Sequence, residues 1–254
     1  MSGVLHVVGL GPGSSEQTTP EASAAVEGAS DLLGYAPYLD RLSLRPGQRR
    51  HASDNREELF RARAALELAA EGKTVAVVSG GDPGVFAMAA AVCEAIEHGP
   101  DAWREIDLRV APGVTAMLAV AARAGAPLGH DFCAISLSDN LKPWELVERR
   151  LRLAAQAGFV MAFYNPISRA RPWQLGRAFE ILCEELSGET PVVFGRAAGR
   201  ADERMAVAPL RDARGDMADM ATCVIVGSPE TRLVMRKSLP PLVYSPRFSA
   251  GGSR

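Results

Sequence analysis

Residues 4–13, Val-Leu-His-Val-Val-Gly-Leu-Gly-Pro-Gly, join a short β-branched apolar run to a glycine-rich turn. The same arrangement recurs at residues 74–84, where Thr-Val-Ala-Val-Val is followed by Ser-Gly-Gly-Asp-Pro-Gly. Helical patterns follow both turns, one beginning at Thr19-Pro20 and one covering 85–96. Short apolar strands that alternate with helices are typical of an α/β fold with a largely parallel sheet.

Beyond these two stretches, the sequence predicts two α/β domains, over 1–124 and 125–248, followed by a flexible Gly/Ser-rich tail at 249–254. Two late apolar segments, near 205–208 and 222–227, lack a long helix between them, which predicts an antiparallel edge to the second sheet. The acidic and basic residues of the helix predicted at 143–157 are expected to form exposed i,i+4 pairs. These residues are Glu145, Glu148, Arg149 and Arg152. The other elements expected are strands at 108–110, 132–137, 159–163 and 191–195 and helices at 58–72, 115–123 and 172–186.

Composition excludes several classes of protein. The chain has 254 residues, of which 47% are hydrophobic and 23% charged, so it can form a packed core and long disorder is not expected. A net charge of −2 provides no overall field for a nucleic-acid backbone. No apolar stretch is long enough to cross a membrane. No lysine or arginine precedes Arg41, and the four cysteines include no CxxC pair, so we expect a cytoplasmic protein with reduced thiols.

Five glycine-containing or polar turns each follow a predicted strand, which is where α/β proteins bind their ligands. The first turn departs from a dinucleotide fingerprint, because Ser14 stands where a third glycine is expected and Pro12 lacks a backbone N–H. Asp31 stands near the position of a ribose-binding acid, so a dinucleotide site and a simple tight turn both remain open. For Thr115, ligand binding and helix N-capping are likewise both open.

Other kinds of chemistry find little support. The turns contain no Walker lysine, no Gly-x-Ser-x-Gly occurs, and the histidines lack metal-type spacing, so no metal site is predicted. A cluster of basic residues between the early elements is either a solvated loop or a clamp for a polycarboxylate substrate, since arginine binds carboxylates bidentately. The cluster consists of Arg41, Arg45, Arg49, Arg50, His51 and Arg56, and Arg169 and Arg171 are further candidates.

Taken in order, these segments resemble the S-adenosylmethionine-dependent tetrapyrrole (corrin/porphyrin) methylases. The matching pieces are VVGLGPG at 7–13, SGGDPGVF at 79–86, APGVTA at 111–116, MAFYNP at 161–166 and VIVGS at 224–228. The resemblance implies two α/β domains with S-adenosylmethionine in the cleft between them, a tetrapyrrole substrate and a homodimer. The cofactor-binding positions that it implies are Pro12, Gly80, Gly81, Asp82, Val85, Thr115, Ala116, Tyr164, Asn165 and Ala197.

Finer similarities lie at 32–42, 138–151 and 164–175. Together with Asn165, which replaces a methionine of the uroporphyrinogen-methylating relatives, they imply methylation of precorrin-3B at C17 with ring contraction. Ring contraction needs a proton to move, and His51 and Asp139 are the candidate acid–base residues. Arg45, Arg49, Arg56 and Arg169 are the candidate substrate-binding residues.

Three alternatives stay open at this point. A sister methylase that acts on another corrin carbon would share the same turns. A nucleotide-linked oxidoreductase would use Gly9, Gly11 and Asp31 and would bind a nicotinamide cofactor. A tetrapyrrole carrier would bind the macrocycle without methyl turnover.

Overall fold

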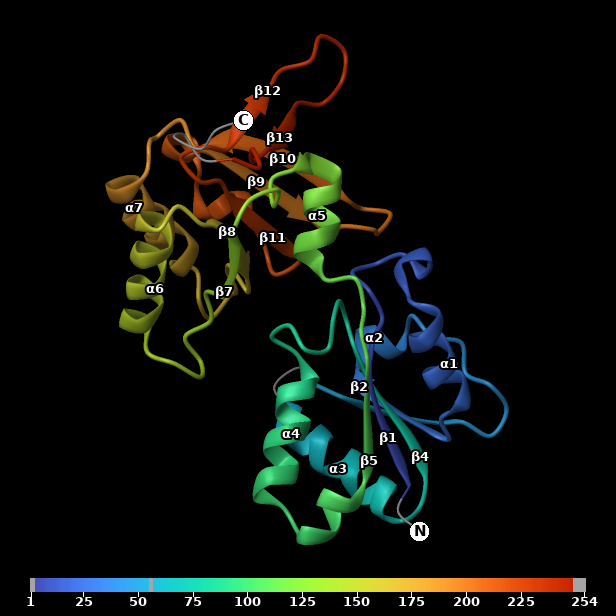
Figure 1. Ribbon diagram of the computed structural model, residues 1–254. Helices are drawn as coiled ribbons and strands as arrows, with labels where there is room; N and C mark the ends of the chain where they lie inside the picture. Colours follow the sequence, from blue (N-terminus) through green and yellow to red (C-terminus); the bar gives the residue numbers. More distant parts are fainter. Residues whose placement is uncertain (1–2, 55–56, 249–254) are drawn as a thin grey trace. The chain divides into compact units, whose positions relative to one another are not determined.

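The computed structural model describes residues 3–54 and 57–248, which divide into two compact units with the boundary between Thr115 and Ala116 (Figure 1). The predicted tail at 249–254 lies outside the described residues. The division falls nine residues before the boundary expected from the sequence. Helix α5 (Ala116–Ala124) makes the difference, because it packs on strands β9 (Pro191–Arg196) and β11 (Thr222–Val226) of the second unit.

The first unit contains a parallel sheet of order β3-β2-β4-β1-β5. Helices α3 and α4 cover one face and α1 and α2 the other, with an apolar core on each side (Figure 1). The predicted α/β class is thus confirmed. The strands are β1 (Val4–Gly9), β2 (Asp31–Tyr35), β3 (Arg49–Ser53), β4 (Thr74–Ser79) and β5 (Asp107–Ala111); the helices are α1 (Pro20–Gly28), α2 (Ala36–Leu39), α3 (Glu58–Ala70) and α4 (Met88–His98). Short 3-10 turns lie at Ser15–Gln17 and Asp101–Glu105.

Helix α1 begins as the sequence predicts. The side chain of Thr19 accepts a hydrogen bond from the amide of Ala22 at 3.1 Å, and Pro20 occupies the first turn. Helix α4 begins at Met88 instead of the expected Val85, because the backbone before it is not helical. Phe86 has a φ of 52° and Ala87 is extended.

The second unit contains a mixed sheet of order β10-β9-β11-β8-β7. Its remaining strands are β7 (Phe132–Ser136), β8 (Val160–Tyr164) and β10 (Arg204–Pro209). Strand β10 forms the predicted antiparallel edge, but β11 lies inside the sheet, antiparallel to both β8 and β9. All five residues of β11 are buried, which suits a central strand covered on both faces.

Helices α6 (Trp144–Gln156) and α7 (Gln174–Glu185) lie beside each other in the second unit (Figure 1). The prediction of exposed i,i+4 charge pairs on α6 is wrong for Glu148 and Arg152, which pair with residues of α7. Glu148 accepts from Arg177 at 3.0 Å, and Arg152 lies 2.9 Å from Glu185.

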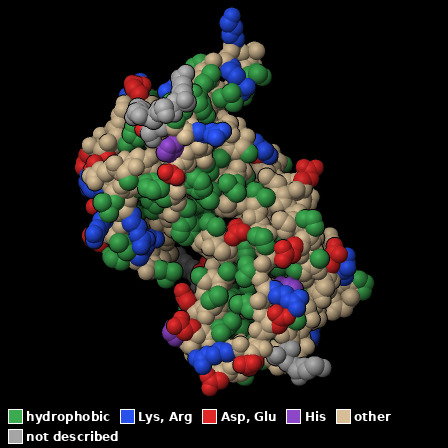
Figure 2. Space-filling model, viewed as in Figure 1, with side chains coloured by type: hydrophobic (Ala, Val, Ile, Leu, Met, Phe, Trp, Pro, Cys, Tyr) green, Lys and Arg blue, Asp and Glu red, His purple; other side chains and the backbone are tan. Residues whose placement is uncertain are grey.

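A small third sheet joins β12 (Arg232–Val234), β13 (Leu242–Tyr244) and β6 (Gly125–Ala126), so part of the expected linker is a strand. Short 3-10 turns lie at Leu210–Asp212 and Gly215–Met217. In the described part of the chain, no helix has the length and apolar character needed to span a bilayer. Acidic and basic side chains are interspersed on the face shown in Figure 2, in keeping with the small net charge.

Candidate functional site

Three turns of the first unit meet at the carboxyl ends of the neighbouring strands β4, β1 and β5. Gly9, Gly81 and Gly113 are in such close backbone contact that we call them the glycine junction. A Cβ atom on Gly9 would lie 2.6 Å from the Gly81 carbonyl oxygen and 2.7 Å from the Gly113 nitrogen. Only glycine permits this approach, so the junction explains why these turns contain glycine at these positions.

Paired hydrogen bonds join the first two turns. The amide of Gly81 donates to the Gly11 carbonyl at 2.9 Å, and the amide of Gly11 donates to the Gly81 carbonyl at 3.2 Å. Both glycines have positive φ, at 68° and 69°, a conformation that glycine adopts without steric cost. The two turns therefore form one antiparallel bridge at the end of a parallel sheet.

Asp82 ties this bridge to the third turn. One carboxylate oxygen accepts from the amide of Gly84 at 2.8 Å, and the other accepts from the amide of Gly113 at 3.0 Å. The family resemblance implies a cofactor contact for Asp82, and the link to Gly113 is an additional structural role. Each carboxylate oxygen can accept more than one hydrogen bond, so the predicted cofactor contact stays a prediction.

Arg41 also stabilises the first turn. Its guanidinium donates to the carbonyl oxygens of Leu10, Gly11 and Gly13 at 2.6, 3.0 and 3.2 Å. The sequence indicates a solvated basic loop or a substrate clamp for Arg41, but in the structure its side chain binds the backbone of its own unit. A side chain that holds three carbonyl oxygens fixes the path of the turn.

In the second unit, the ends of β7, β8 and β9 share one edge of the sheet, since β8 and β9 are both antiparallel to β11. The Tyr164 hydroxyl accepts from the amide of Met117 at 3.0 Å and so caps the first turn of α5. The side-chain amide of Asn165 donates to the Ser136 hydroxyl at 3.1 Å. Ala197 is buried and donates its amide to the carbonyl of Ala221.

Three non-glycine residues of the described chain have left-handed backbone. They are Phe86, Asn165 and Ala197, with φ of 52°, 51° and 51°. This conformation costs on the order of 1–3 kcal/mol per residue and is concentrated at functional sites. Each of the three lies in or directly after a turn that the sequence singled out.

The other predicted cofactor-binding residues lie along the same turns. Pro12 follows Gly11, and Gly80 is so close to the ring of Tyr38 that a Cβ atom there would lie 2.8 Å from it. Val85 is partly buried, Thr115 is buried at the end of the first unit, and Ala116 begins α5.

His51 and Arg49 belong to an internal network around Asp31, whose side chain is fully buried. His51 Nε2 lies 2.8 Å and Arg49 Nε 3.1 Å from Asp31 Oδ1, and Ser30 donates to the other oxygen at 2.8 Å. Burial alone would raise the pKa of Asp31, but the hydrogen bonds from His51 and Ser30 and the charge of Arg49 lower it below its ordinary value.

This network lies at the amino end of the sheet, because Asp31 and Arg49 begin β2 and β3. The glycine junction lies at the carboxyl end. Asp31 is thus already bound and buried, which removes the ribose-binding acid of the dinucleotide hypothesis. The predicted catalytic role of His51 and substrate-binding role of Arg49 stay predictions.

The other candidates are also placed individually. Arg45 pairs with Glu27 at 2.7 Å on the surface, Arg169 is exposed, and Arg56 lies outside the described residues. Both carboxylate oxygens of Asp139 lie 3.2 Å from the Gln174 side-chain nitrogen. Their functional roles remain predictions as well.

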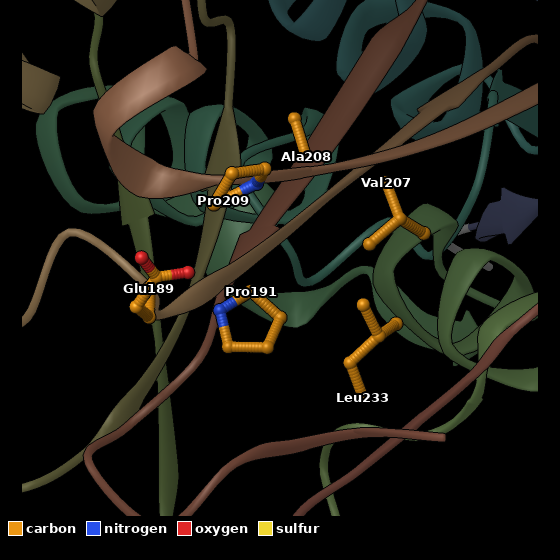
Figure 3. A pocket seen from close by; sticks show the side chains of 6 residues that line it. All are labelled: Glu189, Pro191, Val207, Ala208, Pro209 and Leu233. Atoms are coloured by element: carbon orange, nitrogen blue, oxygen red, sulfur yellow. The ribbon is translucent and has the colours of Figure 1, made fainter. Parts of the chain in front are cut away.

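Two surface hollows lie elsewhere. One of about 140 Å³ is at the β9–β10 edge, and Figure 3 shows the side chains of Val207 and Leu233 at its border. Another of about 280 Å³ is lined by His6, Glu21 and Arg109 beside α1. Neither contains a predicted site residue. Within residues 3–54 and 57–248, no cluster of three His, Cys, Asp or Glu side chains could hold a metal ion.

The chain is similar in sequence and structure to known methylases and methyltransferases. The sequence model described as Tetrapyrrole (Corrin/Porphyrin) Methylases matches residues 4–214. A Sinorhizobium protein named Precorrin-3B C(17)-methyltransferase is 68% identical over 254 residues, which is the whole of both chains. The crystal structure of the methyltransferase CobJ is 53% identical, covers 96% of this chain and 100% of its own, and superposes with a TM-score of 0.91. A uroporphyrin-III C-methyltransferase from Thermus thermophilus, solved with S-adenosyl homocysteine, has the same fold at 24% identity and a TM-score of 0.68, covering 89% of this chain and 97% of its own. The chain belongs to the tetrapyrrole (corrin/porphyrin) methylase family.

Proposed function

We propose that the chain transfers a methyl group from S-adenosylmethionine to C17 of precorrin-3B, with contraction of the ring to precorrin-4, in cobalamin biosynthesis. The observation that carries this proposal is the 68% identity, over 100% of both chains, to the Sinorhizobium precorrin-3B C(17)-methyltransferase. The glycine junction supports the proposal, together with Asp82 and Arg41, whose side chains hydrogen-bond to the backbone of the turns. They give the chain a preformed group of turns at the carboxyl edge of its parallel sheet, where α/β proteins bind their ligands.

The turns suit S-adenosylmethionine. Close backbone approach at Gly9, Gly81 and Gly113 fixes the three turns relative to one another, so the backbone that would meet the cofactor is held in place before it binds. When bound, the cofactor supplies an electrophilic methyl group on a sulfonium. In the first unit, Pro12, Gly80, Gly81, Asp82, Val85 and Thr115 would hold it; in the second unit, Ala116, Tyr164, Asn165 and Ala197 would do so.

The chain's own residues would bind and orient the cofactor and the substrate. Methyl transfer to an electron-rich carbon needs no protein nucleophile, and alignment alone can supply about 7–11 kcal/mol of barrier lowering. Asp82 and Arg41 contribute by fixing the turns before any ligand arrives. For the proton that moves in ring contraction, Asp139 is better placed than His51, because it lies at the carboxyl edge of its sheet and not in the Asp31 network.

Calorimetric titration with S-adenosylhomocysteine, with NAD as the control ligand, tests the class of cofactor. We expect saturable binding of the first alone, and binding of NAD alone would contradict the proposal. Turnover with a ¹³C-labelled methyl donor and enzymatically prepared precorrin-3B then tests the reaction. Carbon-13 NMR should locate the label at C17, and a label at another carbon would indicate a sister methylase.

A second candidate substrate is the cobalt-containing analogue. A Salmonella typhimurium protein named Probable cobalt-factor III C(17)-methyltransferase is 40% identical over 90% of this chain and 94% of its own. The higher identity to the precorrin-3B enzyme favours the metal-free substrate. Competition between the two substrates in one assay measures the preference directly.

We further propose a homodimer, which the family resemblance implies, located in the cytoplasm, as the composition of the sequence predicts. Sedimentation velocity of the purified chain tests the dimer, and a monomer at micromolar concentration would contradict it. Cell fractionation with an antibody to the chain tests the location.

A further inference from the structure

Gln174 is a buried polar side chain whose amide is only half satisfied. It is the first residue of α7 and 1% exposed, and its side-chain nitrogen lies 3.2 Å from each carboxylate oxygen of Asp139. Its side-chain oxygen is buried and has no hydrogen-bond partner among the described residues. An unpaired buried oxygen lowers stability, and an apolar side chain of similar length would avoid that loss. The fold itself therefore gains little from a glutamine here, and the distinct contribution of its amide is the contact with Asp139.

The Asp139 carboxylate is held by this one group. Asp139 lies in the loop between β7 and α6 and is partly exposed. Apart from the contacts with Gln174, its oxygens form no hydrogen bond or ion pair with any residue that the structure describes. A carboxylate oxygen can accept more than one hydrogen bond, so both oxygens remain able to accept from a ligand.

Asp139 and Gln174 belong to neighbouring connections at one edge of the second sheet. Strands β7 and β8 are parallel neighbours, so the segments that follow them leave the same carboxyl edge. Side chains fix these segments: Asn165 donates to the Ser136 hydroxyl at 3.1 Å, and Arg171 donates to the Asn165 carbonyl at 3.3 Å. The carboxylate is thus held on a defined frame at an edge of the kind where α/β proteins bind their ligands.

An exposed aromatic ring directly precedes Gln174 in the chain. Trp173 is 47% exposed and packs edge-to-face on Trp144, with the ring centroids 4.9 Å apart. A half-exposed ring that is held by a second ring offers a rigid apolar surface, which a flat conjugated macrocycle can cover. A carboxylate able to accept and an apolar surface beside its partner are together suited to a tetrapyrrole.

We propose that Gln174 is a positioning residue that orients Asp139 as the proton acceptor in ring contraction. The inference rests on the proposed function, which supplies the substrate and the contraction. In this step the O–H bond of a substrate hydroxyl breaks, the proton bonds to a carboxylate oxygen of Asp139, and the electron pair stays on the substrate oxygen. The Gln174 amide faces both carboxylate oxygens, so it fixes the orientation of the acceptor before the substrate binds.

The first test removes the amide of Gln174 and keeps its volume. Gln174→Met eliminates both the donor and the unpaired buried oxygen, so we expect its free energy of unfolding to equal or exceed that of the wild type. The kcat for ring contraction should fall about 10–100-fold, because the proton acceptor loses its alignment. The KM for precorrin-3B and the affinity for S-adenosylhomocysteine should stay within twofold. A parallel loss of stability and kcat would assign Gln174 a structural role and overturn the inference.

Gln156→Met is the matched control. Gln156 is exposed and donates its side-chain amide to Glu185 at 3.1 Å, which is the same kind of contact between an amide and a carboxylate. Gln156 and Glu185 are the last residues of α6 and α7, whereas Gln174 is the first residue of α7, so the control contact lies away from the carboxyl edge of the sheet. Its loss should leave kcat and KM unchanged.

Asp139→Asn and the double variant test whether Gln174 acts through Asp139. Asp139→Asn keeps the size of the side chain and removes the proton acceptor, so it should lower kcat about 10²–10⁴-fold. In that background Gln174→Met should cause no further loss, whereas a loss equal to its effect in the wild type would overturn the positioning role. Asp139 is partly exposed, so Asp139→Asn decides even where Gln174→Met fails to fold: a kcat within threefold of wild type would overturn the inference.

Carbon-13 NMR of the wild-type product separates this inference from the proposed function. Methylation at C17 with contraction, together with Gln174→Met indistinguishable from Gln156→Met, would overturn the positioning role and leave the function standing. A contracted product labelled at another carbon would overturn the proposed function, and the same variants would still decide the role of Gln174. A methylated product without contraction would overturn both.

Discussion

Gly113→Ala tests whether the glycine junction organises the site. A Cβ atom at Gly113 would lie 2.9 Å from both the carbon and the oxygen of the Gly9 carbonyl, and closer still to the Gly81 carbonyl oxygen. Real Cβ atoms essentially never approach within 3.0 Å of other heavy atoms, so something must shift. Gly113 has no positive φ, so the penalty comes from crowding alone.

The magnitude follows from what is crowded. Extra methyl groups in well-packed regions cost about 1–3 kcal/mol, and the upper end applies here because backbone atoms of two neighbouring strand ends cannot rotate aside. We therefore expect about 3 kcal/mol of lost stability in the first unit. Moving the third turn away also lengthens the 3.0 Å hydrogen bond from its amide to Asp82, so affinity for S-adenosylhomocysteine should fall at least tenfold.

Gly28→Ala is the matched control in the same unit. Gly28 ends α1, has no positive φ, and would place its Cβ in open space. Replacement there should stabilise the protein by about 0.5–1 kcal/mol and leave cofactor affinity unchanged. Urea unfolding followed by circular dichroism, together with calorimetry, measures both quantities. If Gly113→Ala matches Gly28→Ala in both, the junction accommodates a Cβ atom and does not organise the site.

Three further predictions concern other parts of the molecule. Asp31→Asn should cost about 2 kcal/mol at neutral pH, because it removes a buried charge from its partners. Because the pKa of Asp31 is lowered in the folded protein, its contribution to the free energy of unfolding is complete above about pH 4 and is lost as the pH falls through the lowered value. The free energy of unfolding should therefore fall less steeply with acidification in the variant than in the wild type, and equal slopes would contradict this. Ala197→Gly should change the free energy of unfolding by no more than about 0.5 kcal/mol, because relief of the left-handed backbone strain offsets the lost methyl group. Ala198→Gly, at the neighbouring buried residue, should lower the free energy of unfolding by about 1.5 kcal/mol. Equal losses of stability in thermal unfolding would refute the assignment of strain to Ala197. Burial raises the pKa of Cys223 to about 12, so its thiol should resist an aromatic disulfide reagent at pH 8 while the exposed Cys93 reacts, and equal labelling in the folded protein would count against the buried position.

The sequence predicted those strands whose own residues carry the signal. Strands β1 and β4 are β-branched apolar runs, and both lie where they were expected. Strand β3, Arg-Arg-His-Ala-Ser, has no such signal and was missed. Among the described residues it is an edge strand paired with β2 alone, and the buried carboxylate of Asp31 contacts two of its side chains, Arg49 and His51. Tertiary contacts, and not local propensity, thus determine this strand.

The candidate site likewise has features that the sequence predicts and features that it does not. Turns after strands could be located, because strand ends and glycines are visible in the sequence. The partners of Asp82 and Arg41 could not, since both reach backbone groups about 30 residues away, at Gly113 and Leu10. Nothing in the sequence positions of Asp82 and Arg41 distinguishes a side chain that hydrogen-bonds to the protein backbone from one that contacts a ligand.

The difference between the predictable and the unpredictable features of the site has a chemical cause. A methyl transfer whose electrophile belongs to the cofactor places its demands on alignment, and alignment here comes from backbone held against backbone. Histidines, cysteines and paired carboxylates are the usual indicators of an active site, yet His51 stabilises a sheet edge and Cys223 lies in the core. What marks this site is glycine without room for a Cβ and, at Phe86, Asn165 and Ala197, left-handed backbone in residues that ordinarily avoid it. In such a protein, substitutions that change the backbone should affect cofactor binding more than those that change charge, and charge should matter where the polycarboxylate substrate is held.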